Sequence, residues 1–211
     1  MKTLKEATLT ISHEEFGWLL KHGPFRDVSC VSFVRSLTPS EALIRLGAEE
    51  DTIEEVTFDA HQERTMEYIY SDNFRSSYVG ALEKDGWTIL IQFWTGSLTT
   101  DEHLLRSLSR ATEVVSVYRN VQASDCFSYT VDGELVTFFD QLAPYARRGS
   151  APDRLLDTMR EVGLDLGPSR ETPIAHNPFP QCFALAKKIT GISFTEDTVN
   201  TPLLGAAVRN R

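Results

Sequence analysis

Residues 78–94, YVGALEKDGWTILIQFW, contain the strongest signal for a two-residue hairpin. Asp85-Gly86 stands between two runs of alternating apolar residues, and this dipeptide suits a two-residue hairpin turn, whose central residues both need positive φ. The turn predicts antiparallel strands over residues 78–84 and 87–94. The predicted register gathers three facing pairs on one apolar face: Leu82 and Ile89, Gly80 and Ile91, and Tyr78 and Phe93.

A second hairpin repeats this pattern later in the chain. Asp132-Gly133 separates residues 126–131 from residues 134–139, and both runs alternate apolar and polar side chains. The register that follows from a simple two-residue turn pairs two sets of large side chains: Phe127 with Phe138, and Tyr129 with Val136.

The remaining elements read as strands and amphipathic helices. Residues 28–34 and 113–119 are strand-like, while residues 13–21, 38–47, 100–110, 151–162 and 181–190 have helical spacing of their apolar residues. The sequence therefore predicts an α+β fold, with an antiparallel sheet of about five strands and two tight hairpins, covered by amphipathic helices.

The whole chain, residues 1–211, is expected to form a single domain, since its length suits one core. Four prolines make residues 167–180 an extended connection. This connection leads to a C-terminal helical segment, residues 181–211, whose tail docks through Leu203 and Leu204.

Composition and charge exclude several classes of protein. The formal net charge of −9 argues against nucleic acid as a ligand, because a polyanion needs a basic surface. No apolar run is long enough to cross a membrane, and residues 1–10 lack the pattern of a signal peptide. Cys30, Cys126 and Cys182 lie far apart among apolar neighbours, which predicts unpaired, buried thiols. We expect a cytoplasmic protein without membrane contact.

The most distinctive feature is an acidic segment between Glu41 and Glu67, with nine acidic residues, two basic ones and a local balance of −7. One interpretation is a solvated loop and helix face that aids solubility. The other is an electrostatic landing site for a basic protein. The candidate partner-binding residues are this segment's central carboxylates and one tryptophan at a predicted strand end: Glu49, Glu50, Asp51, Glu54, Glu55, Asp59, Glu63 and Trp94.

Patterns typical of catalysis or cofactor binding are absent from the sequence. There is no phosphate-binding loop, dinucleotide fingerprint or nucleophile elbow, and no histidine lies at metal-ligand spacing from another histidine or a cysteine. Asp101-Glu102-His103 is the one local cluster of acid and imidazole. It reads either as a general acid or base, or as the first turn of a helix. We therefore assign no catalytic residue, metal or cofactor.

Four stretches together resemble a family of uncharacterised actinobacterial proteins that is known only as a domain of unknown function. They are residues 84–92, KDGWTILIQ; 108–120, LSRATEVVSVYRN; 153–163, DRLLDTMREVG; and 189–194, ITGISF. Where that family usually has a glutamate followed by Asn-Gly, this chain has Gln92, Phe93 and Trp94, which argues against an essential carboxylate there. The resemblance implies the one-domain fold and supplies no activity, cofactor or partner.

Two hypotheses of function follow. The first is a non-catalytic protein-binding module, one form of which is an immunity-type inhibitor that occupies a basic toxin or enzyme through its acidic surface. The alternative is a small-molecule enzyme or ligand-binding protein whose site is assembled from distant residues, with Glu102 and His103 as local candidates.

Overall fold

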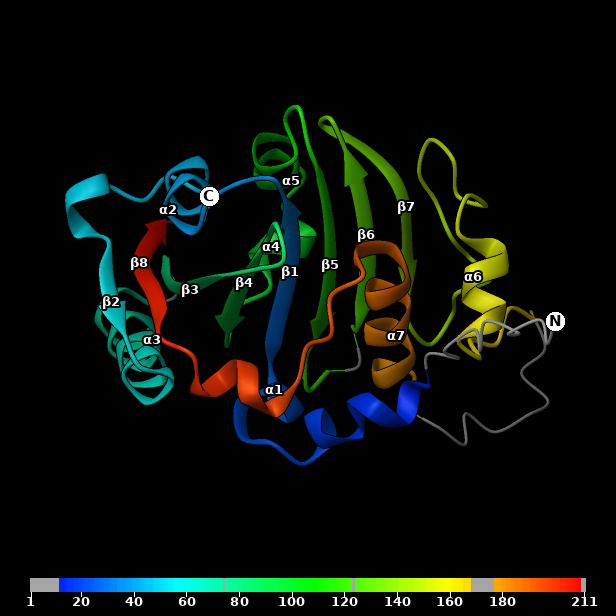
Figure 1. Ribbon diagram of the computed structural model, residues 1–211, viewed down its shortest axis with the longest axis horizontal. Helices are drawn as coiled ribbons and strands as arrows, with labels where there is room; N and C mark the ends of the chain where they lie inside the picture. Colours follow the sequence, from blue (N-terminus) through cyan, green and yellow to red (C-terminus); the bar gives the residue numbers. More distant parts are fainter. Residues whose placement is uncertain (1–11, 74, 123, 168–176, 210–211) are drawn as a thin grey trace, which may run out of the picture.

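A single antiparallel sheet organises the molecule (Figure 1). The computed structural model describes residues 12–73, 75–122, 124–167 and 177–209. Its eight strands lie in the order β2-β8-β3-β4-β1-β5-β6-β7. Their bounds are β1 Ser29–Arg35, β2 Glu54–Val56, β3 Ser76–Lys84, β4 Trp87–Phe93, β5 Glu113–Arg119, β6 Cys126–Val131, β7 Glu134–Asp140 and β8 Leu203–Arg209.

Helices cover both faces of this sheet. Their bounds are η1 His13–Leu20, α1 Gly23–Asp27, α2 Pro39–Arg45, η2 Glu50–Thr52, α3 Phe58–Asp72, α4 Ser97–Thr100, α5 Glu102–Leu108, α6 Leu156–Glu161, α7 Phe179–Thr190 and η3 Glu196–Asn200. The aromatic-rich core includes residues of η1, α1, α3, α6 and α7 on one face, and a smaller aliphatic core includes residues of α2, α4 and α5 on the other. The α+β class is confirmed, and the sheet has eight strands rather than about five.

Both hairpins form with turns at the predicted dipeptides. Asp85 and Gly86 have φ values of 49° and 79°, and Asp132 and Gly133 have 47° and 79°, as this kind of turn requires. In the first hairpin Leu82 pairs with Ile89 and Gly80 with Ile91, as expected. That ladder ends at Val79 and Gln92, one position before the expected pair of Tyr78 and Phe93.

The predicted register of the second hairpin is wrong by one residue. Phe127 pairs with Phe139 instead of Phe138, and Tyr129 pairs with Thr137 instead of Val136. The cause is a β-bulge beside Tyr129 and Thr130, which inserts Val136 into β7 as an unpaired residue. As a result Phe139 is fully buried and its ring stacks on Phe127 at 5.0 Å.

Three predicted helices differ from expectation in extent or type. Residues 13–20 form a 3-10 helix, and the expected helix over residues 151–162 is regular only as α6. The expected helix over residues 100–110 is divided: α4 ends at Thr100, and α5 begins after Asp101, which caps it. At the start of α2, Thr38 and Glu41 form a capping box.

The C-terminal part of the chain differs most from the predicted structure. The helix α7 ends at Thr190, as expected, and Gly191 follows it with φ 77°. Residues 203–209, however, form β8, a strand between β2 and β3 and not a docked helical tail. The sequence LLGAAVR does not indicate a strand, because Gly205, Ala206 and Ala207 stand where large apolar residues usually alternate with polar ones. At Gly205 the small residue is required, because Tyr78 lies against it and a Cβ atom would collide with the tyrosine ring. Of the expected connection, residues 168–176 lie outside the described residues.

The three cysteines are unpaired and buried, as predicted. Removal from water disfavours the thiolate, and it raises the pKa of Cys30 to about 11. Within the described residues, no helix is both long and apolar enough to cross a membrane.

His61 is a buried histidine on the inner side of α3. It has no exposed surface, its ring edge lies against Gly80, and the rings of Tyr78 and Phe93 are 5.8 and 5.3 Å away between centroids. Desolvation disfavours the imidazolium in this position and lowers the pKa of His61 to about 4.

We predict that His61 makes the fold acid-sensitive. The folded pKa lies below the unfolded value, so the unfolded chain binds the proton more readily and stability falls as the pH drops below about 6.5. Between pH 7 and pH 5 the wild type should lose about 2 kcal/mol more than His61→Leu. Urea unfolding at several pH values measures this, with His103→Leu at an exposed position as the control. Parallel pH curves for the wild type and His61→Leu would contradict it.

The outer edge of β7 is closed by the segment around Gly149. Main-chain bonds run from Phe138 N–H to the Arg148 carbonyl and from Ser150 N–H to the Leu135 carbonyl, at 2.8 and 3.0 Å. Gly149 has φ 130° and leaves no room for a Cβ atom beside the Val136 carbonyl. Close approach of two backbones therefore requires glycine here.

We predict that Gly149→Ala destabilises the fold by about 2 kcal/mol more than Gly163→Ala, since overpacking adds to the strain of positive φ. Gly163 is a matched control because it has φ 83° with open space around it. Chemical unfolding of both variants measures the difference. If both variants lose the same free energy of unfolding, residues 148–151 can move to accommodate the added methyl group, and the prediction is wrong.

Candidate functional site

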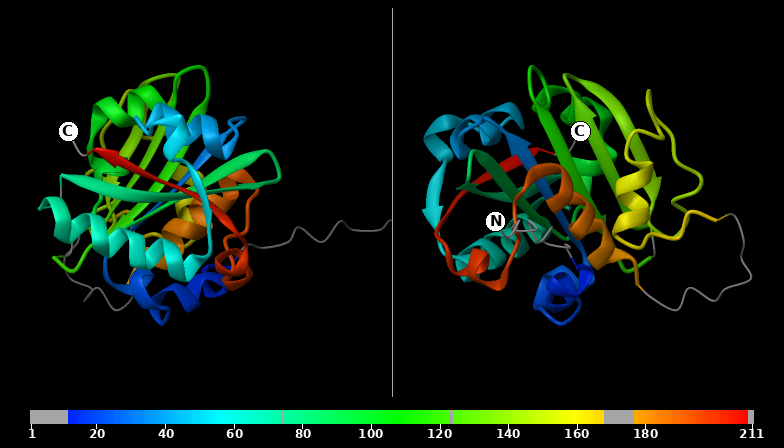
Figure 2. Two further views of the ribbon diagram at one scale, coloured as in Figure 1. Left: turned by 90° about the vertical axis from the view of Figure 1, so that its left-hand side faces the viewer. Right: turned by 45° about the vertical axis from the view of Figure 1, so that its right-hand side comes forward.

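The acidic segment forms one end of the molecule. Glu49, Glu50 and Asp51 lie at η2, Glu54 and Glu55 on β2, and Asp59 and Glu63 on α3; all seven are exposed. The left view of Figure 2 faces this end, where α3 runs across the molecule. The structure thus brings the predicted carboxylates to the β2 edge of the sheet and the adjoining outer surface of α3. We call this surface the acidic edge.

Cations neutralise only part of the acidic edge. Arg64 contacts Glu54 at 3.4 Å and Glu67 at 3.2 Å. Arg45, the other cation of the segment, points elsewhere and donates to the carbonyls of Leu108 and Arg110, at 3.2 and 2.7 Å. Within the described chain, six carboxylates of the edge have no ion pair: Glu49, Glu50, Asp51, Glu55, Asp59 and Glu63.

Glu54 has a structural role beneath this surface. It accepts a hydrogen bond of 3.0 Å from the hydroxyl of Tyr78, whose ring stacks on Tyr68 at 5.7 Å. Burial, followed by the neighbouring carboxylate of Glu54, raises the pKa of Tyr78 above its usual value. The phenol therefore stays protonated and donates to Glu54, which fixes β2 against β3 through their side chains.

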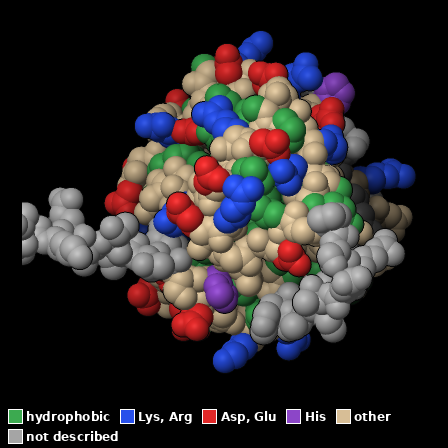
Figure 3. All heavy atoms as spheres, turned by 90° about the vertical axis from the view of Figure 1, so that its right-hand side faces the viewer, with side chains coloured by type: hydrophobic (Ala, Val, Ile, Leu, Met, Phe, Trp, Pro, Cys, Tyr) green, Lys and Arg blue, Asp and Glu red, His purple; other side chains and the backbone are tan. Residues whose placement is uncertain are grey.

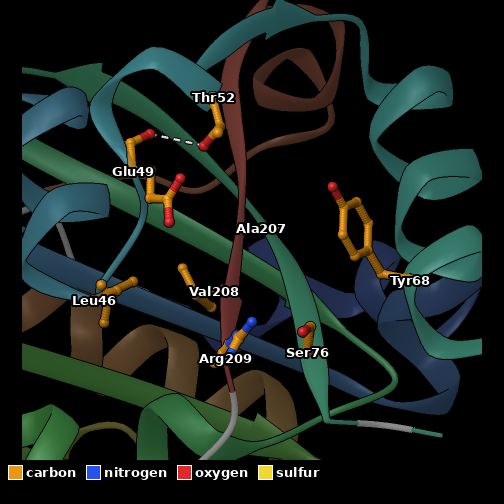
Figure 4. Close-up of a pocket in the computed structure, with 9 residues that line it drawn as sticks. Leu46, Glu49, Thr52, Tyr68, Ser76, Ala207, Val208 and Arg209 are labelled. Carbon is orange, nitrogen blue, oxygen red and sulfur yellow. Dashed lines mark hydrogen bonds between the residues drawn. The ribbon is translucent and has the colours of Figure 1, made fainter. Parts of the chain in front are cut away.

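A cavity of about 690 Å³ opens beside β8 at the acidic edge (Figure 4). Leu46 and Tyr68 lie on its two sides, and Ala207, Val208 and Arg209 of β8 run between them. Glu49 and Thr52 lie at one end, joined by a 2.7 Å bond from the Thr52 hydroxyl to the Glu49 carbonyl, and Arg209 lies near Ser76 at the other. The cavity thus has apolar walls and polar ends.

A second, shallower cavity of about 510 Å³ lies on the outer face of α3. Glu63, Met66, Glu67 and Tyr70 line it, and Tyr70 is 77% exposed. An aromatic and a methionine framed by carboxylates match the composition of protein interfaces, where such residues supply apolar contact. Tyr68, Tyr70 and Arg209 are not among the residues predicted from the sequence. Helical spacing along α3 would have placed Tyr70 beside Met66 and Glu67.

Trp94 is not part of the acidic edge. It follows β4, and β4 lies three strand positions from β2, which corresponds to about 14 Å. Its side chain is 37% exposed, and its backbone has φ 64°, in the left-handed region that favours glycine. The structure therefore separates this predicted contact residue from the predicted carboxylates.

The cluster Asp101-Glu102-His103 begins a helix. The carboxylate of Asp101 accepts the main-chain N–H groups of His103 and Leu104, at 2.8 and 3.1 Å. Glu102 lies in the first turn of α5 and contacts Arg148 at 3.7 Å. These contacts match the helix-cap interpretation of the cluster. In the described part of the chain, no group of three or more acidic, histidine or cysteine side chains is arranged to hold a metal.

The opposite end of the molecule has a different charge pattern. In Figure 3, basic and acidic side chains are interspersed over that face. Ion pairs there include Arg160 with Asp157 of α6 at 2.6 Å and Lys188 of α7 with Glu161 at 2.9 Å. This mixed and partly paired arrangement contrasts with the six carboxylates without an ion pair that the described chain gathers at the acidic edge.

Comparison with known proteins gives a family but no activity. Residues 9–207 match the model of a family described as "Family of unknown function (DUF6461)", and the chain belongs to that family. No curated protein and no solved structure matches the chain significantly.

We predict that Trp94→Gly is more stable than Trp94→Ala by about 1 kcal/mol, because only glycine adopts positive φ without strain. Both substitutions remove the same indole, so their difference reports the backbone alone. Urea unfolding of the two variants measures it. A more stable alanine variant would contradict the left-handed backbone at this position.

Proposed function

We propose that this protein is a non-catalytic protein-binding module, which holds a basic partner protein against its acidic edge. The observation that carries the proposal is the set of six exposed carboxylates without an ion pair in the described chain. Like charges gathered on one surface repel one another, and an oppositely charged partner relieves that repulsion. An immunity-type inhibitor of a basic toxin or enzyme is one form that such a module takes.

The outer face of α3 supports the same proposal. Tyr70 and Met66 offer apolar contact, while Glu63 and Glu67 frame them with negative charge. Charged rims mainly raise the rate of encounter and select the partner, whereas desolvated aromatic anchors slow dissociation. The acidic edge therefore combines both elements of a specific interface.

We predict that reversing four carboxylates of the edge, Glu50, Asp51, Glu55 and Glu63, to lysine abolishes partner capture from a lysate of the native host. Each is exposed, and none has an ion pair within the described residues. With the captured partner, association should slow at least about tenfold at low salt, and the difference should shrink as salt screens the charges. Surface plasmon resonance at several salt concentrations measures this.

A matched control carries the same change of net charge elsewhere. Glu14, Glu83, Glu134 and Glu196 are exposed and lie outside the acidic edge, and their reversal to lysine should leave capture intact. Equal association rates for the wild type and the edge variant would show that the acidic edge is a solvated surface only. Equal losses in both variants would attribute binding to net charge, not to this surface.

A further inference from the structure

The strand β8 continues beyond its pairing with β2. β2 pairs with Leu203, Leu204 and Gly205, whereas β8 runs on to Arg209 and stays paired with β3 along its other side. We call residues 206–209 the overhang.

The turn η2 explains why the pairing stops. Continuing the β2 register would place Ile53 opposite Ala206 and Thr52 opposite Ala207. The N–H groups of Thr52 and Ile53 instead donate to the carbonyls of Glu49 and Glu50, at 3.0 and 3.4 Å. Within the part of the chain that the structure describes, no main-chain group pairs with the outer side of the overhang.

The large cavity lies against the overhang. Ala207, Val208 and Arg209 line it. Lys84 and Trp87 close the two-residue hairpin as a hydrogen-bonded pair, so alternate residues of β3 pair with β4, and Ser77 and Val79 direct their N–H and C=O groups at β8. Their partners Val208 and Ala206 therefore pair with β3, and the N–H and C=O groups of Ala207 and Arg209 face outward. This alternation matches an antiparallel strand, in which every second residue directs its N–H and C=O to the same side. An unpaired strand edge is a template for another strand.

At the other edge of the sheet, a neighbouring segment supplies hydrogen-bond partners for the main chain of β7. Residues 148–151 cover β7, where Phe138 and Arg148 exchange two main-chain bonds of 2.8 Å, and Ala151 N–H donates to the Val136 carbonyl at 3.0 Å. The overhang on β8 has no such cover within the described residues. The two edges therefore differ in charge and also in how many of their main-chain N–H and C=O groups have hydrogen-bond partners.

The negative charge around the cavity favours a basic segment over a second copy of this chain. Glu49 lines the cavity, Glu50 and Asp51 follow it on η2, and Glu55 lies on the adjoining β2. Among the lining residues Arg209 is the one cation, at the far end beside Ser76 (Figure 4). A second copy of this chain would bring two such acidic rims together, which repulsion opposes, whereas a basic segment meets opposite charge.

We propose that the overhang is a strand-addition site, which takes an extended basic segment of the partner protein as a new strand in line with β2. This inference rests on the proposed function and specifies how the partner binds. Main-chain bonds to Ala207 and Arg209 would hold the segment, and its alternate side chains would face Leu46 on one side and Tyr68 on the other. Four residues of overhang accommodate a contact about 13 Å long.

The test uses two synthetic probes. The first is a capped octapeptide of alternating lysine and valine, and the second is the same peptide with its four central amides N-methylated. Both have the same charge, but the second lacks donors for strand pairing. The first peptide should bind at least about tenfold more tightly, as the loss of two main-chain bonds implies. Its binding should slow hydrogen exchange at the Ala207 and Arg209 amides, measured by NMR.

Two proline variants test which N–H groups of β8 face the cavity and which face β3. Ala207→Pro removes the N–H that faces the cavity, so the protein should stay folded and bind the first peptide about tenfold more weakly. Ala206→Pro is the matched control, which removes an N–H directed at β3 and should instead lower stability in urea unfolding. A loss of stability in Ala207→Pro with none in Ala206→Pro would overturn the assigned orientation and, with it, the site.

The remaining outcomes separate this inference from the proposed function. Equal binding of both peptides, lost on reversing Glu50, Asp51, Glu55 and Glu63, would overturn strand addition and leave acidic recognition standing. Failure of the wild type to bind either peptide at millimolar concentration would overturn the strand site, whatever partner the lysate yields. A dimer in sedimentation, with the Ala207 amide protected in the absence of peptide, would assign the overhang to a second copy and overturn the basic occupant.

Discussion

Every strand in a sheet needs hydrogen-bond partners for its main chain, and this requirement shapes both ends of the molecule. At β7, residues 148–151 supply the partners, and Gly149 permits the close approach. At the other end β2 supplies them for only three residues of β8, because η2 uses the next N–H groups in its own turn. The asymmetry between these edges leaves one strand segment open beside the acidic edge.

The position of β8 depends on two glycines that face each other. Gly80 and Gly205 pair across β3 and β8, which leaves room for His61 to lie against Gly80 and for Tyr78 to lie against Gly205. Tyr78 then reaches Glu54 on β2 with its hydroxyl. This packing joins β8 to β2 and α3, although β8 is distant from both in the sequence. The acidic edge and its cavity exist only because this packing forms.

At the acidic edge, the negative charge comes from one segment of the sequence, whereas the cavity is formed by segments that are far apart in the sequence. The carboxylates lie within residues 49–63, all of them are exposed, and Glu54 alone among them has an ion pair within the described chain. The cavity is lined by residues from 46–76 and from 207–209, two segments far apart in the sequence. The charge is the basis of the proposed recognition of a basic partner, and the open strand edge is the basis of the proposed strand addition.

Local sequence was enough to predict the two hairpin turns, the buried thiols and the acidic segment. Each depends on neighbouring residues, whose preferences can be read directly. Three other features depend on the folded chain: the bulge that shifts Phe139 opposite Phe127, the strand formed by residues 203–209, and the separation of Trp94 from the acidic edge. These features depend on contacts between distant segments. β8 in particular lacks the usual strand pattern, and its Gly205 is required by the ring of Tyr78, a contact that the neighbouring residues in the sequence do not reveal.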